Sequence, residues 1–214
     1  DLSTDLYDSL AEMKLDRVDL YLLHRDDPAY PVGLLVEEFN KHWKDGKIGA
    51  FGGSNWTHPR LAEAWAYAEA HGLRPMNVSS PNFSLADQVE SPWGPDCISI
   101  SGPKNAEARR WYAERDFPVI AWSSLARGFF AGNISRDDIS ALANGPDRSS
   151  VKAYCHETNF RRLDRVQILA REKGLSVPQI AMAWVMNQPL NLFCLIGCYN
   201  KEQFQQNLEA STLK

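Results

Sequence analysis

The sequence predicts an α/β protein built on a parallel sheet of about five strands, and two observations support this fold class. Apolar segments typical of buried strands alternate with helical segments along the whole chain. The helices between the strands span about 10–15 residues, which is the spacing of βαβ units. No linker or low-complexity segment interrupts the alternation, so residues 1–214 are expected to form a single domain.

The first part of the chain is expected to contain three helices and three strands. Four apolar residues at helical spacing predict the first helix: Leu2, Leu6, Leu10 and Met13. The strands are expected at residues 18–24, 48–53 and 76–80. A second helix should cover residues 32–44 and end at Gly46, because glycine favours the turn that closes a helix. Thr57 can cap the third helix, with Pro59 in its first turn and Gly72 at its end.

The second part of the chain is expected to add two strands, at residues 117–122 and 192–196. A loop rich in proline and glycine leads to a helix at residues 104–115, and a long polar segment at 127–159 is expected to hold short helices. Three further helices follow. An apolar stripe over Phe160–Ala170 marks the first, and Ser176 begins the second, with Pro178 in its first turn. The third is expected at Asn200–Glu209.

Composition and charge argue against several classes of protein. The formal net charge is −4 and no basic patch occurs, which argues against nucleic-acid binding. No segment approaches the roughly 20 apolar residues of a membrane-spanning helix. Four cysteines occur at irregular spacing, and a reducing cytoplasm is the expected compartment: Cys97, Cys155, Cys194 and Cys198. Cys194 and Cys198 flank an apolar run and are expected to be free and mostly buried. The scattered histidines do not have the spacing of a metal site.

Polar and aromatic residues follow the expected strands, where parallel sheets bind their ligands. These strand ends carry His24, Ser54, Asn55, Ser80, Trp122 and Ser123. Serine and asparagine can hydrogen-bond a carboxamide, and tryptophan can stack on a flat ring, so an amide-bearing aromatic ligand is expected. After the last strand, Gly197 leads into a helix whose first N–H groups favour an anion such as phosphate.

Several segments resemble the aldo-keto reductase family in the same order, and the resemblance covers nearly the whole chain. VDLYLLHRDDP resembles the strand that ends in the family's catalytic histidine, and GKIGAFGGSNW the strand whose Ser-Asn pair holds the nicotinamide carboxamide. VIAWSSLARGFFAG resembles the strand and loop beside the nicotinamide ring and pyrophosphate. LIGCYNKEQFQQNL resembles the last strand and the helix that holds the adenosine phosphate. The resemblance implies strands four to eight of a TIM-type (β/α) barrel, a partial barrel without its first three strands.

The resemblance also implies roles for individual residues. His24 takes the place of the catalytic histidine, and Trp122 the place of the aromatic residue that stacks on nicotinamide. Ser54, Asn55 and Ser80 take the carboxamide positions, although many members have glutamine where Ser80 stands. The remaining cofactor positions are Ser123, Leu125, Gly128, Gly197, Cys198, Gln203, Gln206 and Asn207. Gln203 replaces an arginine that faces the 2′-phosphate in many members, so the cofactor is expected to be NADP or NAD, with the choice between them left open.

The resemblance implies reduction of a small carbonyl substrate, with a tyrosine as proton donor and an aspartate and a lysine beside it. No such set precedes His24, because Asp5, Tyr7 and Lys14 belong to the first helix at other spacings. A general acid contributes about 10²–10⁴ in rate, so this chain by itself is expected to keep the cofactor side with little or no activity. Three accounts of the truncation stay open: a natural partial barrel, a fragment of a longer gene, or strands supplied by a second chain.

The alternative is a non-catalytic partial barrel that is structural or self-associating. Missing strands would leave open edges at residues 18–24 and 192–196, and open edges favour pairing with another strand. Structural interpretations also exist for single motifs. Gly52–Asn55 is compatible with a turn and helix cap, and Trp122 with a core position. Asp26 and Asp27 are interpreted as a solvated loop, and the helix residues Trp65, Trp111 and Trp184 as packing residues.

Overall fold

The computed structural model describes residues 1–131, 134–137, 139–142 and 148–214. The chain forms two compact units, Asp1–Ser80 and Pro81–Lys214, and each is described by itself. The fold is α/β with five strands, and every strand pair within a unit is parallel, as predicted. The single domain expected over residues 1–214 stays a prediction.

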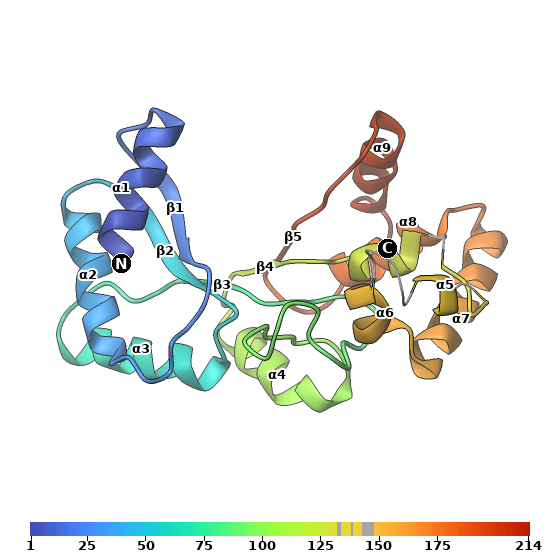
Figure 1. Ribbon diagram of the computed structural model, residues 1–214, viewed down its shortest axis with the longest axis horizontal. Coiled ribbons are helices and arrows are strands. Elements are labelled where there is room, and N and C mark those ends of the chain that lie inside the picture. The colour runs from blue at the N-terminus through green and yellow to red at the C-terminus, as the bar shows by residue number, and fades with distance from the viewer. Residues whose placement is uncertain (132–133, 138, 143–147) are drawn as a thin grey trace. The chain divides into compact units, whose positions relative to one another are not determined.

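The first unit alternates helices and strands in the predicted order (Figure 1). Its elements are α1 (Leu2–Met13), β1 (Val18–Leu23), α2 (Val32–Lys44), β2 (Ile48–Ser54), α3 (His58–Ala70) and β3 (Val78–Ser80). β2 lies between β1 and β3 and pairs with both in parallel. The carboxyl ends of the three strands therefore meet at one edge of this part of the sheet.

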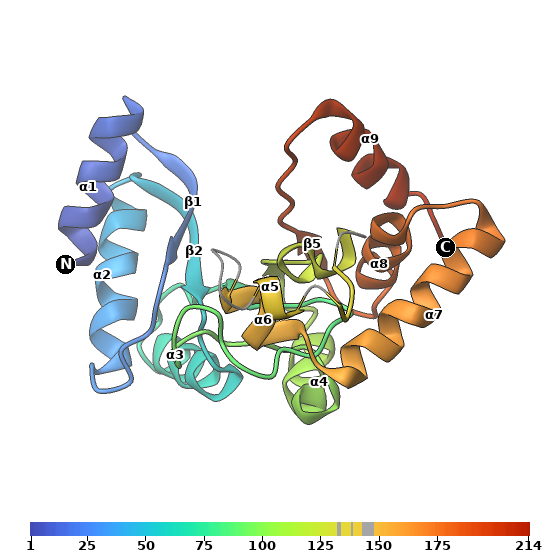
Figure 2. The same cartoon turned by 45° about the vertical axis from the view of Figure 1, so that its right-hand side comes forward.

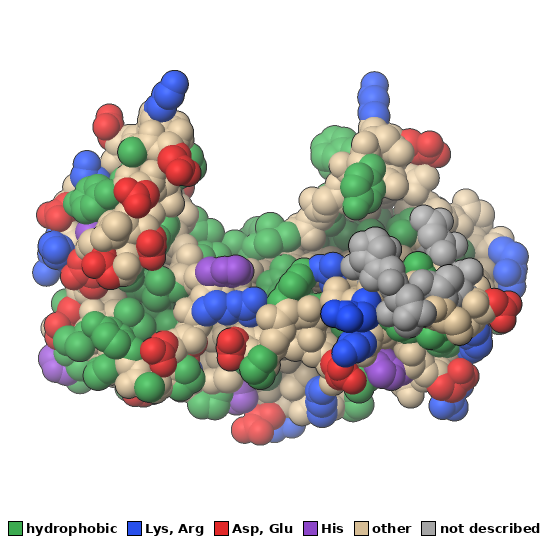
Figure 3. Space-filling view, viewed as in Figure 1, with side chains coloured by type: hydrophobic (Ala, Val, Ile, Leu, Met, Phe, Trp, Pro, Cys, Tyr) green, Lys and Arg blue, Asp and Glu red, His purple; other side chains and the backbone are tan. Residues whose placement is uncertain are grey.

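The helix α1 begins at a side-chain cap and ends at a left-handed residue. Asp1 accepts a hydrogen bond from the backbone N–H of Thr4 at 2.9 Å, and Lys14 adopts φ 56° at the other end. Leu2, Leu6 and Leu10 are buried as predicted, whereas Met13 is 50% exposed because the helix ends there. Several acidic side chains lie at the surface in the region of this helix, as Figure 3 shows.

The helix α1 lies beside α2 (Figure 2), and a polar cluster links the two. The Ser3 hydroxyl lies 2.7 Å from Nε2 of the buried His42 and donates to the carboxylate of Glu38. The bond from Ser3 lowers the pKa of Glu38, because it stabilises the charged carboxylate. The hydrogen bonds of Ser3 with Glu38 and His42 thus join α1 to α2 within the first unit.

Gly52 lies in β2 at a point where a side chain has no room. A Cβ atom on Gly52 would lie 1.8 Å from the carbonyl oxygen of Val78 in β3. The substitution Gly52→Ala is therefore expected to displace β2 from β3 and to lower the free energy of unfolding by about 1–3 kcal/mol. Urea denaturation of the wild-type and variant chains measures this difference.

Gly197 provides the matched control for this prediction. A Cβ atom there would have no other atom within 4 Å, and its φ is not in the left-handed region. Gly197→Ala should change the free energy of unfolding by less than about 0.5 kcal/mol. Equal losses for the two alanine variants would contradict the close approach of β2 to β3.

The second unit contains two strands and most of the helices. Its elements are η1 (Pro103–Asn105), α4 (Ala106–Glu114), β4 (Val119–Ala121), η2 (Ala126–Ala131), α5 (Ile139–Leu142), α6 (Arg148–Tyr154), α7 (Glu157–Lys173), α8 (Val177–Met186), β5 (Leu192–Cys194) and α9 (Lys201–Ala210). β4 and β5 pair in parallel. The short helices expected within 127–159 are confirmed where that segment is described, and residues 132–133, 138 and 143–147 lie outside the described residues.

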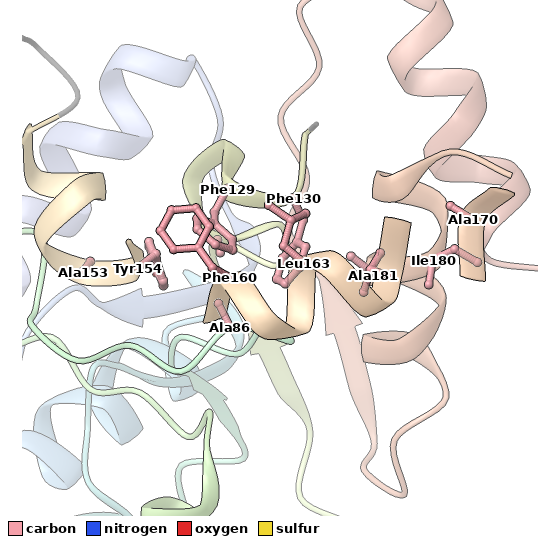
Figure 4. Packing of buried hydrophobic residues seen from close by; sticks show 12 residues of the cluster. Ala86, Phe129, Phe130, Ala153, Tyr154, Phe160, Leu163, Ala170, Ile180 and Ala181 are labelled. Carbon is pink, nitrogen blue, oxygen red and sulfur yellow. The ribbon is translucent and has the colours of Figure 1, made fainter. Parts of the chain in front are cut away.

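An aromatic core holds the second unit together (Figure 4). Phe129 is fully buried between Phe130 and Phe160, with ring centroids 5.2 Å apart in both pairs. Leu163 of α7 and Ala181 of α8 extend this core along the two helices. The core therefore joins η2, which follows β4, to α7 and α8.

The predicted helix signals are confirmed, whereas four strands are shorter than expected and β2 extends one residue further, to Ser54. Ser176 and Gln179 form a capping box at the start of α8, and Thr57 caps α3. β4 begins after Pro118, which has no N–H to donate to a strand ladder. It ends before Trp122, whose N–H bonds the carbonyl of Pro81 at 3.1 Å.

Candidate functional site

The predicted residues of the first unit form one cluster at the ends of its strands. The Ser54 hydroxyl donates to the Ser80 carbonyl at 3.0 Å, and the Asn55 backbone N–H donates to the same oxygen at 3.1 Å. The Asn55 side-chain amide donates to the His24 carbonyl at 3.2 Å and to the Ser54 hydroxyl at 3.1 Å. The structure therefore brings His24, Ser54, Asn55 and Ser80 together, as expected.

These hydrogen bonds join the ends of β1, β2 and β3. Asn55 adopts φ 61°, a left-handed conformation that asparagine tolerates better than most residues. Asn55 as a whole is 6% exposed, whereas His24 is exposed directly after β1. The same four residues thus fix the strand ends and present an imidazole to solvent. Their role in cofactor binding stays a prediction.

Asp26 and Arg60 form a nearly buried ion pair beside this cluster. Their side chains are 9% and 10% exposed, and Arg60 Nε lies 3.2 Å from the Asp26 carboxylate. Arg60 also donates to the Tyr30 carbonyl and bonds the exposed Glu63 at 3.0 Å. Burial raises the pKa of Asp26, and Arg60 opposes this rise. The interpretation of Asp26 as solvated is wrong, because Arg60 of α3 covers it, whereas Asp27 is exposed.

The predicted residues of the second unit surround a cavity of about 930 Å³. Eight of the nine predicted positions line it: Ser123, Leu125, Gly128, Gly197, Cys198, Gln203, Gln206 and Asn207. They come from the loop after β4, the loop after β5, and α9. The volume falls within the roughly 300–1,000 Å³ typical of cofactor sites.

The loop after β4 has an unusual backbone. Ser123, Ala126 and Arg127 have φ of 52°, 52° and 50°, and Gly128 follows with φ 90°. Left-handed residues other than glycine cost free energy, so the surrounding contacts must hold this conformation. One such contact is the bond from the Ser124 hydroxyl to the Ala121 carbonyl at 3.2 Å. This loop forms the η2 wall of the cavity.

The helix α9 forms a second wall that is rich in amides. Asn200 caps α9 by accepting from the N–H of Gln203 at 2.9 Å, and the Gln203 side chain accepts from the N–H of Tyr199 at 2.9 Å. Asn207 is buried and donates to the Cys198 sulfur at 3.3 Å. Cys198 itself is exposed, so the expectation that it is mostly buried is wrong.

Trp122 does not line the cavity. Its ring lies 5.2 Å from that of Trp93 at an angle of 57°, and the Arg127 guanidinium lies 4.3 Å from the centre of the Trp93 ring. Among the described residues, no hydrogen-bond partner meets the buried Trp122 Nε1. Trp93 thus packs against the ring that was expected to stack on a ligand. Trp93 lies in the loop rich in proline and glycine, and the sequence analysis did not identify it as a site residue.

The two charged residues of the cavity wall were also missed. Arg127 stands in the left-handed loop and donates to the Ser150 hydroxyl of α6 at 3.0 Å, while Glu202 lies in the first turn of α9. The only hint in the sequence was that both residues lie within segments that resemble the family's cofactor-binding segments, VIAWSSLARGFFAG and LIGCYNKEQFQQNL. A loop arginine and a helix glutamate are common, so this signal was weak.

Other ligand classes find less support in the described part of the chain. Within that part, no group of three histidine, cysteine or acidic residues has the arrangement of a metal site. No described helix has both the length and the apolar character needed to cross a bilayer. Cys97, Cys155, Cys194 and Cys198 are free thiols, which confirms the prediction made for Cys194 and Cys198. The hydroxyls, the amides and the arginine of the cavity wall suit a polar anionic ligand.

A sequence model described as the aldo/keto reductase family matches residues 1–214. The chain belongs to the aldo/keto reductase family. Two curated relatives, each matching 94% of this chain, are the uncharacterized oxidoreductase YrpG of Bacillus subtilis (strain 168), 26% identical, and a probable voltage-gated potassium channel subunit beta of Oryza sativa subsp. japonica, 27% identical. This aldo/keto reductase chain spans 56% and 58% of their lengths.

Solved aldo/keto reductase structures share the fold. The thermostable aldo-keto reductase Tm1743, solved with the inhibitor epalrestat, has a TM-score of 0.69 at 19% identity; the match covers all of this chain and 61% of that one. The glycerol dehydrogenase AKR11B4 of Gluconobacter oxydans has a TM-score of 0.72 at 21% identity, with 99% and 58% of the two chains covered. The chain thus has the TIM-barrel-type α/β fold of this family.

Proposed function

We propose that this chain supplies the cofactor-binding part of a NAD(P)H-dependent carbonyl reductase. The cavity of the second unit carries the proposal, because its walls hold the kinds of group that a dinucleotide needs. Arg127 and the first N–H groups of α9 suit a pyrophosphate. The amides of Gln203, Gln206 and Asn207 suit the adenosine half.

The strand-end cluster of the first unit is assigned to the nicotinamide side of the same reaction. When bound, the nicotinamide supplies the hydride that reduces a carbonyl carbon. The hydroxyl of Ser54 and the amide of Asn55 are polar groups fixed by backbone bonds, which suits them to hold a carboxamide. His24 is exposed beside them and can donate a hydrogen bond to a carbonyl oxygen. The resemblance to the family assigns Trp122 to the nicotinamide ring.

The proton donor is assigned to residues other than those of this chain. Asp5, Tyr7 and Lys14 lie on or next to α1, and the Tyr7 ring packs edge-on against His42 at 5.6 Å. These residues therefore serve α1 rather than a catalytic site. We expect the 214-residue chain to bind the cofactor and to reduce aldehydes at least about 100-fold more slowly than an ordinary reductase, since Tyr7 does not take the place of the family's tyrosine proton donor. Barrel strands additional to the five described here would supply that acid.

Cofactor titration tests the proposal directly. We expect calorimetry to detect binding of NADH or NADPH, and Arg127→Gln to weaken it by about 10- to 100-fold, because a charge-assisted hydrogen bond contributes about 1.5–3 kcal/mol. Arg165→Gln is the matched control, because this exposed arginine of α7 bonds the carbonyl of Arg161, one turn earlier. Absence of binding up to millimolar cofactor would refute the proposal, and turnover at ordinary rates would refute the inactivity of the chain.

Self-association through the sheet edges remains part of this proposal. β5, the loop after it and α9 expose several large apolar side chains: Phe193, Leu195, Ile196, Phe204 and Leu208. Figure 3 shows apolar atoms over α9 on the side in view. Such a surface favours contact with another polypeptide.

Family membership favours the reductase over a purely structural chain.

A further inference from the structure

The cavity of the second unit has its two charges on different walls. Among its described lining residues, Arg127 is the single cation and Glu202 the single anion. Arg127 belongs to the η2 wall, where Ser150 accepts from its Nε at 3.0 Å and Trp93 packs against its guanidinium. These contacts hold the positive charge at η2. The wall formed by α9 therefore carries a carboxylate without a lining cation.

The neighbours of Glu202 on α9 are neutral. The Gln203 oxygen is occupied by the N–H of Tyr199, which leaves its NH₂ group as a donor toward the cavity. The Gln206 oxygen meets the Ser176 hydroxyl at 3.4 Å, and Asn207 donates to Cys198. This wall thus offers neutral amide donors and one carboxylate acceptor.

The two nicotinamide cofactors differ in what they require at the adenosine ribose. NADP(H) carries a phosphate dianion on the 2′-oxygen, which needs a cation and is repelled by a carboxylate. NAD(H) carries a free 2′-hydroxyl, which donates a hydrogen bond that a carboxylate accepts well. A wall with Glu202 and neutral amides can therefore accept the 2′-hydroxyl of NAD(H), whereas it repels the 2′-phosphate of NADP(H).

We propose that α9 selects NAD(H) over NADP(H), with Glu202 as the residue that determines this specificity. The inference rests on the proposed binding of a nicotinamide cofactor in this cavity. Glu202 accepts the ribose hydroxyl, and Gln203 donates to the ribose or adenine. Arg127 serves the pyrophosphate, which both cofactors share, so it contributes nothing to the choice between them.

Calorimetric titration with four ligands at one ionic strength tests this inference. NADH should bind at least about tenfold more tightly than NADPH, and 5′-AMP about tenfold more tightly than 2′,5′-ADP, since one charge-assisted hydrogen bond is gained or lost. The two nucleotides differ only in the 2′-phosphate, so this pair isolates the adenosine ribose from the pyrophosphate and the nicotinamide. The variant Glu202→Gln should reduce both ratios to about one, and Glu202→Gln with Gln203→Arg should reverse them.

Glu172→Gln is the matched control, because this glutamate is exposed on α7 outside the cavity, and the variant should leave both ratios unchanged. If NADH and NADPH both fail to bind, the proposed function itself is refuted. If both bind but NADPH binds equally or more tightly, only the selectivity is refuted. If NADH is preferred and Glu202→Gln keeps the preference, the assignment to Glu202 is overturned.

Discussion

Replacing Arg60 by methionine is expected to lower the free energy of unfolding by about 3–5 kcal/mol at neutral pH. The variant leaves the carboxylate of Asp26 nearly buried without its partner, at 9% exposure. It also removes the cation that lies 5.6 Å from the Trp56 ring centre and the bond to the Tyr30 carbonyl. Urea denaturation measures the loss, which exceeds that of an ordinary surface substitution.

The loss should depend on pH in a defined direction. Burial already raises the pKa of Asp26, and Arg60 lowers it, so the variant raises that pKa further. A folded state whose carboxyl has a raised pKa binds its proton more readily than the unfolded chain does, so stability falls as pH rises through the folded pKa. The cost of Arg60→Met should therefore be largest at neutral pH and shrink as the solution becomes acidic.

Two further variants separate the buried pair from the exposed one. Arg60→Met combined with Asp26→Leu should recover most of the loss, since it removes both buried charges. Glu63→Gln removes a partner of Arg60 that is 58% exposed and should cost less than about 1 kcal/mol. A loss below about 1 kcal/mol for Arg60→Met itself would mean that Asp26 is solvated after all.

Replacing Asn82 by alanine should lower the free energy of unfolding by about 3 kcal/mol or more, because a buried polar group left unpaired costs about 1–3 kcal/mol. The Asn82 amide is fully buried and donates to the Trp122 carbonyl at 3.1 Å and to the Tyr154 hydroxyl at 3.3 Å. Its oxygen accepts from the hydroxyls of Ser99 and Ser101 at 2.8 and 3.4 Å. Thermal unfolding monitored by circular dichroism measures the effect.

The same substitution should weaken cofactor binding, because Asn82 fixes the backbone of Trp122 at the end of β4. Ser99→Ala is a milder variant, expected to cost about 1 kcal/mol, that keeps the test informative if Asn82→Ala does not fold. Asn187→Ala is the control, since this exposed asparagine bonds the carbonyls of Ala183 and Leu213 at the surface. If the alanine variants of Asn82 and Asn187 lose equal amounts of unfolding free energy, the buried hydrogen bonds of Asn82 do not stabilise the fold as expected.

Much of the fold could be predicted because helix signals are local. Thr57 and Ser176 cap their helices as predicted, and the apolar stripe of Leu2, Leu6 and Leu10 is buried. The cavity positions were predicted from the resemblance to a family whose strand ends recur in the same order. Strand ends were less accurate, because the length of a strand depends on the partner beside it.

The sequence by itself determined the α/β alternation, the family and most residues of the candidate site, because periodicity, capping and strand-end motifs are properties of neighbouring residues. Only the tertiary structure decided that Arg60 covers Asp26, that Trp93 packs on Trp122, and which charges line the cavity. These contacts join residues far apart along the chain. Their free energy depends on burial and distance, neither of which is encoded in any local pattern.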